Sequence, residues 1–266
     1  MHQSTHKINS PLPLYWRALE QCMPDRLVEK VISLYKHKLI INKTEININT
    51  KVNILAFGKA SRLMYIAARK IVGDDFFGQG LLISHETNTE LVFKSSRDKI
   101  LKSSHPFITS LSQISGKEAK RFVEKSNESD ILLVLVSGGG SAMVALPVTG
   151  LDLKEKINFI TRIMHLSVPE REVNILKKAL SRIKGGKLAE AATANTVVNC
   201  ILSDERSHKI SAISSGMTVH NKSINPIEIM DKYDLWEEAS DNIKNALISH
   251  GAVSYTHLTL PTTPYV

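Results

Sequence analysis

The amino-acid sequence predicts an α/β protein built on a mostly parallel sheet with helices on both faces. Short apolar runs alternate along the chain with longer stretches whose apolar residues recur at helical spacing. The run 131–136 is apolar at every position, which is typical of a strand that helices cover on both sides. No repeat of about 20–50 residues is visible, which argues against solenoids and propellers.

The first half of the chain predicts three helices and two strands. A proline suited to a first helical turn opens an amphipathic stretch, so we expect a helix over about 24–37. The apolar run 53–57 ends at a glycine and predicts a strand, which a tight turn joins to a helix containing 63–71. A second strand is expected at 80–84 and a third helix at 112–125.

The second half of the chain continues the alternation. The buried run 131–136 is the strongest predicted strand, and two helices are expected to follow it, over 153–165 and 170–183. A further strand is expected at 197–202 and a last helix at about 234–249. Strands that alternate with helices in this way predict right-handed crossovers in a parallel sheet.

The C-terminal segment 254–266 departs from the style of everything before it. Four threonines and two prolines replace the charged, helix-rich sequence. We interpret it as a non-native tail appended to a truncated reading frame, with a flexible native tail as the alternative. The expected α/β domain then spans 14–250.

Composition excludes several classes of protein. The 266 residues carry 34 Lys+Arg against 26 Asp+Glu, a formal net charge of +8, and 42% of them are hydrophobic. That hydrophobic share excludes a disordered chain, and without an apolar run of about 18 residues no membrane span is expected. Basic residues alternate with acidic ones, as in 117–121, so we expect no nucleic-acid interface, although a basic protein attracts small anions. Cys22 and Cys200 are expected to be buried, reduced thiols of a cytoplasmic protein, with a single disulfide between them as the alternative.

A glycine-rich loop directly follows the buried strand. It consists of Ser137, Gly138, Gly139, Gly140 and Ser141. Because glycines lack Cβ atoms, successive N–H groups can point into one concavity and bind phosphate oxygens, with the serine hydroxyls as further donors. A flexible linker is the alternative, but apolar runs on both sides of the loop argue against it. Neither a Walker A motif nor a dinucleotide-binding Gly-x-Gly-x-x-Gly motif occurs in the chain.

Further polar loops follow predicted strands, where open α/β sheets bind ligands. Lys59 lies at a helix start whose free N–H groups favour an anion, and a solvated turn lysine is the alternative. Asp204 could hold Mg²⁺, although Ser-Asp is also ordinary turn chemistry. His105 precedes a proline and is interpreted as part of a turn or strand end, with a contact to substrate left open.

The segment 174–189 concentrates positive charge. Five polar residues at spacings of three or four predict a shared helical face: Asn174, Lys177, Lys178, Ser181 and Lys184. Gly185 and Gly186 suit a helix end, and no acidic residue follows until Glu190. The concentration of charge favours an anionic ligand, and a solvated basic helix face is the alternative.

Several of these motifs occur together in one known family. The loop 137–142, the run 174–189 and the segment Ser214-Ser215-Gly216-Met217-Thr218 resemble, in order and spacing, the motifs of glycerate 2-kinases, which are also labelled hydroxypyruvate reductases. Gly58-Lys59-Ala60 and Ser104-His105-Pro106 also fit the family. The resemblance implies a Rossmann-like α/β domain that binds ATP and glycerate against a smaller C-terminal domain. It implies transfer of the γ-phosphoryl group of ATP to the C2 hydroxyl of D-glycerate, which gives 2-phosphoglycerate.

The resemblance also implies roles for individual residues. Phosphoryl transfer needs positioning and charge neutralisation more than covalent chemistry. Lys59 would be the catalytic lysine, the glycine-rich loop would hold the phosphates, and Asp204 would place Mg²⁺. The further residues that would line the site are Asn174, Lys177 and Lys184. The implied cofactors are ATP and Mg²⁺, the implied substrate is D-glycerate, and a homodimer is left open.

The chain also departs from the family pattern. Ser203-Asp204 is followed by Glu205-Arg206 where the family usually has Ser-Asp-Val-x-Gly-Asp-Asp, and Met217 replaces the usual proline. The smaller C-terminal domain has no counterpart in the chain, so an inactive fragment is one expectation. A non-catalytic anion- or nucleotide-binding protein and an NAD(P)H-dependent hydroxypyruvate reductase are the alternatives. The lack of Gly-x-Gly-x-x-Gly argues against the reductase.

Overall fold

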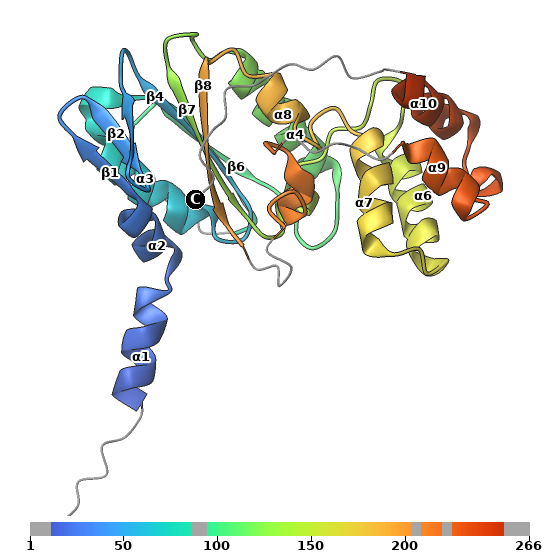
Figure 1. The fold of residues 1–266 in the computed structure, drawn as a ribbon, viewed down its shortest axis with the longest axis horizontal. Helices are drawn as coiled ribbons and strands as arrows, with labels where there is room; N and C mark the ends of the chain where they lie inside the picture. Colours follow the sequence, from blue (N-terminus) through green and yellow to red (C-terminus); the bar gives the residue numbers. More distant parts are fainter. Residues whose placement is uncertain (1–11, 87–94, 204–208, 220–224, 253–266) are drawn as a thin grey trace, which may run out of the picture.

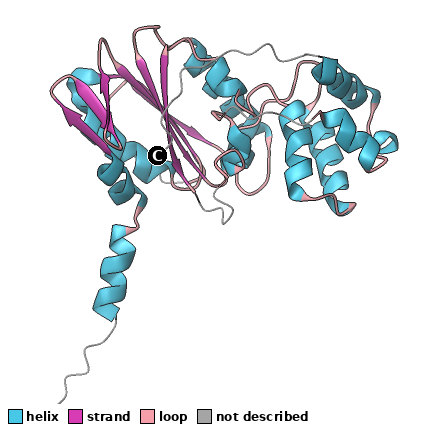
Figure 2. Cartoon of the chain, in the orientation of Figure 1, coloured by secondary structure: helices cyan, strands magenta, loops and turns pink. Residues whose placement is uncertain are grey.

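A five-stranded parallel sheet with the strand order β6-β5-β4-β7-β8 forms the centre of the molecule. The structure is a computed structural model and describes residues 12–86, 95–203, 209–219 and 225–252. The strands are β4 (Val52–Phe57), β5 (Phe77–Ser84), β6 (Asp98–Lys102), β7 (Ile131–Ser137) and β8 (Thr196–Leu202). Helices lie on both faces of this sheet (Figures 1 and 2), so the predicted fold class is confirmed.

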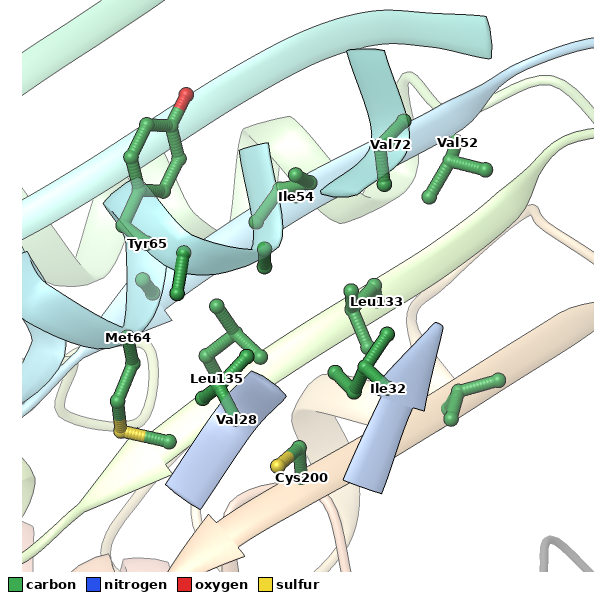
Figure 3. Packing of buried hydrophobic residues seen from close by; sticks show 14 of the residues in the cluster. Val28, Ile32, Val52, Ile54, Met64, Tyr65, Val72, Leu133, Leu135 and Cys200 are labelled. Carbon is green, nitrogen blue, oxygen red and sulfur yellow. The ribbon is translucent and has the colours of Figure 1, made fainter. Parts of the chain in front are cut away.

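Two hydrophobic clusters cover the two faces of the sheet. Successive side chains of a strand point to opposite faces, so Ile54 belongs to one cluster and Leu55 to the other. The helix α3 (Ser61–Phe76) packs on the first face (Figure 3), and α4 (Ser110–Glu124) packs on the second. Every residue of β7 is buried, as its continuous apolar run predicts.

A small antiparallel sheet replaces the second half of the helix that we predicted over 24–37, and that part of the prediction is wrong. The helix α2 covers only Pro24–Val31. Three strands follow it: β1 (Ile32–Tyr35), β2 (Lys38–Ile41) and β3 (Thr44–Asn47). Lys36 and Asn42 have positive φ angles of 53° and 43°, which build the tight turns between the strands. A short apolar stretch is compatible with the spacing of a helix and with that of a strand. The tight turns show that this stretch forms strands.

Four helices share a third hydrophobic cluster beside the sheet. They are α6 (Leu153–His165), α7 (Glu170–Ala179), α9 (Pro226–Lys232) and α10 (Asp241–Ala252). Because α7 stops at Ala179, the helix predicted over 170–183 is too long. The helix predicted over 234–249 begins late, since Asp234 has a φ of 51° and a 3₁₀ turn, η2 (Trp236–Glu238), precedes α10.

The remaining predictions of elements are confirmed with small shifts at their ends. Strand β6 and helix α9 were not expected. The helix α1 (Leu12–Gln21) buries none of its side chains and extends away from the body (Figure 1). Cys22 and Cys200 are both free thiols, but only Cys200 is buried, so the predicted burial is wrong for Cys22, which is exposed. None of the described helices is long and apolar enough to cross a membrane. The segment 254–266 lies outside the described residues.

Candidate functional site

The candidate site lies at the edge of the sheet where the parallel strands end. The loop after β4 begins at Gly58, and the glycine-rich loop after β7 begins at Gly138. The amide of Lys59 donates to the Gly138 carbonyl at 2.8 Å, and the amide of Ala60 donates to the Ser137 hydroxyl at 3.0 Å. These hydrogen bonds join the two loops into one unit.

Glycine is required where the two loops meet. Gly58 has a φ of 119°, and a Cβ atom there would collide with the backbone and the hydroxyl of Ser137. Gly139 has a φ of 83° and adopts the left-handed conformation before the short helix α5 (Gly140–Met143). A side chain at either position would be strained and would push the loops apart.

The glycine-rich loop contains backbone amides without an acceptor among the described residues. The amides of Gly138, Gly139, Gly140 and Ser141 donate to no acceptor in the part of the chain that the structure describes. Successive N–H groups of this kind form a concavity that binds anions such as phosphate. We predicted that other groups can come close to the backbone at these glycines because they lack Cβ atoms. The close contacts at Gly139 and Gly140 agree with that prediction.

A buried turn supports the loop from below. It is the 3₁₀ turn η1 (Ile213–Gly216), in which Ser214 and Ser215 have φ angles of 50° and 57°. The Ser214 hydroxyl donates to the Ser137 carbonyl at 2.9 Å, and the Ser215 hydroxyl lies 2.9 Å from that of Ser141. Both turn serines are buried, so they fix the loop and leave its outer surface to a ligand.

Lys184 reaches the same loop from the opposite side. Its Nζ atom donates to the Ser141 carbonyl at 3.0 Å and also hydrogen-bonds the Ser141 hydroxyl. The side chain is only 3% exposed, and burial, with the charge of Lys177 as a second cause, lowers the pKa of Lys184 to about 7. The described residues place no carboxylate in hydrogen-bonding contact with this amine. An anion bound at the loop would therefore supply the counter-charge that Lys184 lacks.

The shared helical face that we predicted for 174–184 is wrong. Because α7 ends at Ala179, Ser181 and Lys184 lie beyond the helix. Asn174 and Lys177 do lie on α7, and burial lowers the pKa of Lys177. Lys177 is close enough to Lys184 for their charges to repel, whereas no hydrogen bond joins Asn174 to the described part of the glycine-rich loop.

Other lysines of the basic segment stabilise the end of α7. Lys187 donates to the carbonyls of Lys178 and Ser181 at 3.0 and 2.6 Å, and Lys156 of α6 donates to that of Leu180 at 2.7 Å. A helix C-terminus presents unpaired carbonyls and a partial negative charge, which such donors satisfy. Burial lowers the pKa of Lys187 to about 8. Some of the positive charges in this segment therefore stabilise the end of α7, and another contacts the glycine-rich loop.

The sequence analysis left the role of His105 open. In the structure, His105 lies at the candidate site. A Cβ atom on Gly139 would lie 2.8 Å from the Cδ2 and Nε2 atoms of His105 and 3.0 Å from Cγ of Lys59. His105 follows β6, the exposed edge strand that we did not predict. Recognition of β6 would have placed His105 at the same sheet edge as Lys59.

A metal site is not built by the described residues. They contain no group of three or more His, Cys, Asp and Glu side chains that could hold a metal ion. Asp204, the predicted Mg²⁺ ligand, lies outside the described residues. The hydroxyls and amides at the described loop are ligands for phosphate oxygens and do not by themselves form the oxygen-rich shell that Mg²⁺ needs.

Comparison with known proteins gives consistent matches. A family model described as "Domain of unknown function (DUF4147)" matches residues 12–248. A glycerate 2-kinase from Pyrococcus horikoshii is 29% identical over 88% of this chain and 52% of its own length. A glycerate kinase from Danio rerio is 30% identical over 86% of this chain and 48% of its own length.

Comparison of the fold with solved structures gives a similar result. A crystal structure of a protein from Pyrococcus horikoshii superposes with a TM-score of 0.84 at 27% identity, covering 95% of this chain and 58% of that one. The chain spans about half the length of the curated relatives it matches.

Proposed function

Because the chain belongs to the DUF4147 family, we propose that it supplies the ATP-binding part of a glycerate 2-kinase. The reaction is transfer of the γ-phosphoryl group of ATP to the C2 hydroxyl of D-glycerate, which gives 2-phosphoglycerate and ADP. The relatives from Pyrococcus horikoshii and Danio rerio carry the names glycerate 2-kinase and glycerate kinase.

One observation carries this proposal. Two strand-end loops are hydrogen-bonded into a single unit that combines amides without an acceptor among the described residues with two lysines, Lys59 and Lys184. Both substrates are anions, and ATP carries several charges that must be neutralised during transfer. Preorganised amides and cations at one position can stabilise that charge without reorganising.

The chain's residues then take distinct parts. The amides of Gly138, Gly139 and Gly140 would bind phosphate oxygens, with the hydroxyl of Ser141 as a further donor. Lys59 would align the transferring phosphoryl group or the glycerate carboxylate. The residues that would line the rest of the site are Asn174, Lys177 and Lys184.

Mg²⁺ would supply further neutralisation of the phosphate charge when bound. Magnesium usually binds proteins through one or two carboxylates together with phosphate oxygens and water. Asp204 is the candidate carboxylate for this part, because it directly follows a strand of the same sheet. Removal of the Asp204 carboxylate should then weaken ATP binding in magnesium and leave ATP binding in EDTA unchanged.

Glycerate-dependent release of ADP tests the proposal. The unaltered chain is expected to convert D-glycerate to 2-phosphoglycerate, followed by ³¹P NMR, and Lys59→Ala is expected to lose at least about 100-fold in kcat/KM. Lys70→Ala is the matched control, because Lys70 is exposed on α3 and lies away from the loops. Near-normal phosphorylation by Lys59→Ala would refute the role of this lysine.

Anion binding without turnover is the alternative that the same experiment detects. Saturable ATP binding with no 2-phosphoglycerate would support a binding protein. Oxidation of NADH by hydroxypyruvate would instead identify a reductase.

A further inference from the structure

His105 places a group that can accept a proton beside the glycine-rich loop. The contact to Gly139 involves the ring edge that carries Nε2, since both Cδ2 and Nε2 lie 2.8 Å from a Cβ atom built there. The same point lies 3.0 Å from Cγ of Lys59. His105 is half-buried, and its ring borders the loop.

An alcohol that receives a phosphoryl group must lose its proton to some base. A general base must lie within hydrogen-bonding reach of that proton. Lys184 is 3% exposed and lies beneath Ser141, where its amine is occupied by the oxygens of that serine. Among the described residues, none of the side chains found in contact with the glycine-rich loop is a carboxylate. Histidine is the side chain suited to this transfer near neutral pH.

We propose that His105 is the catalytic base that takes the proton of the acceptor hydroxyl. This role rests on the proposed function. The hydroxyl proton passes to Nε2 of His105 while the hydroxyl oxygen forms a bond to the γ-phosphorus of ATP. The bond between that phosphorus and the β–γ bridging oxygen breaks, and ADP leaves with the electron pair. The imidazolium then returns its proton to water.

His85 is the positioning residue for this base. It follows β5, its ring centroid lies 5.7 Å from that of His105, and the two rings are inclined by 55°. Its Nδ1 atom is buried and has no hydrogen-bond partner among the described residues. Among the described residues, His85 after β5 and Lys59 from the loop after β4 border His105.

Substitution of His105 tests the role. His105→Gln keeps a polar group of similar reach but cannot take up a proton at neutral pH, and it is expected to lower kcat by about 100-fold or more while KM changes less than about threefold. The acidic limb of the kcat profile against pH should disappear. His165→Asn is the matched control, because His165 is exposed at the end of α6. Thermal unfolding of each variant checks that the fold is intact.

His85→Asn gives a second, independent readout. It is expected to lower kcat and to leave KM unchanged, because the ring that packs against His105 is lost while the groups proposed to bind substrate are kept. A variant with unaltered kcat would refute the positioning role of His85.

The outcomes separate this inference from the proposed function. Turnover by the unaltered chain together with a His105→Gln variant that retains kcat within threefold and keeps its acidic limb would overturn the role of His105 and leave the kinase function standing. Absence of glycerate phosphorylation by the unaltered chain would overturn the proposed function, and the role of His105 with it.

Discussion

Lys156 and Lys184 are two buried lysines near the end of the same helix, yet their amines are used differently. Lys156 is 7% exposed, and its Nζ atom donates to the carbonyls of Leu180 and Lys177 at 2.7 and 3.5 Å. Lys184 is 3% exposed, and its Nζ atom donates to Ser141 in the glycine-rich loop. Burial lowers the pKa of both lysines.

The comparison shows that burial and a lowered pKa do not identify a binding residue. Both features follow from removing an amine from water, whatever the amine then does. The two lysines differ in the groups that accept their hydrogen bonds. Lys156 completes the hydrogen bonding of a helix end inside the protein, whereas Lys184 contacts a loop whose neighbouring amides are unused in the described structure.

Lys184→Met should have the largest effect, and mainly on activity. The variant removes a cation next to the proposed phosphate site, so kcat/KM for glycerate phosphorylation is expected to fall by at least about 100-fold, or about 2.7 kcal/mol. The variant also loses the hydrogen bond to the Ser141 carbonyl, so its unfolding free energy is expected to fall by no more than about 2 kcal/mol at pH 7. A stable variant with normal kcat/KM would place Lys184 in the same structural class as Lys156.

Lys156→Met should show the opposite pattern. The buried carbonyl of Leu180 loses its donor, which is expected to cost about 2 kcal/mol of unfolding free energy. The values of kcat and KM should stay within about threefold, because Lys156 hydrogen-bonds the end of α7 and makes no hydrogen bond to the glycine-rich loop. Urea unfolding and steady-state kinetics on the same preparation check both parts. Loss of activity without loss of stability would contradict the assignment.

The pH dependence of stability should also separate Lys184→Met from the unaltered chain. The pKa of Lys184 is about 7 in the folded protein and near its ordinary value of 10.5 when unfolded, so between these values the unfolded chain holds the extra proton. Stability of the unaltered chain should therefore rise with pH relative to the variant, by up to about 1.4 kcal/mol per pH unit between pH 7 and 10. Urea titrations at pH 7, 8 and 9 measure this difference. Parallel curves would show that Lys184 does not titrate in this range.

The glycine-rich loop and Lys59 could be predicted because their signals are local. Each follows an apolar run that predicts a strand, and each lies where a strand turns into a helix. Parallel strands present these turns at one edge, so their proximity follows from the fold class. The hydrogen bond between the Lys59 amide and the Gly138 carbonyl agrees with that expectation.

Other parts of the site could not be predicted in this way. Strand β6 is an edge strand of half-buried and exposed residues, so its pattern carries no strong apolar signal and His105 after it was not assigned a place. Ser214 and Ser215 adopt a left-handed conformation that serine rarely prefers, so local spacing does not foretell their turn. The helical face over 174–184 was predicted from spacing alone, and the helix ends too early to form it.

The sequence by itself determined the α/β class, the strands of the buried sheet other than its exposed edge, and the two loops that carry Lys59 and the glycines. These follow from periodicity and turn chemistry, which act between neighbours in the chain. The tertiary structure decided which lysine supports a helix end and which reaches the loop, and it brought His105 against Gly139. Those contacts depend on the strand order β6-β5-β4-β7-β8 and on where α7 ends, because both set distances between residues far apart in the chain.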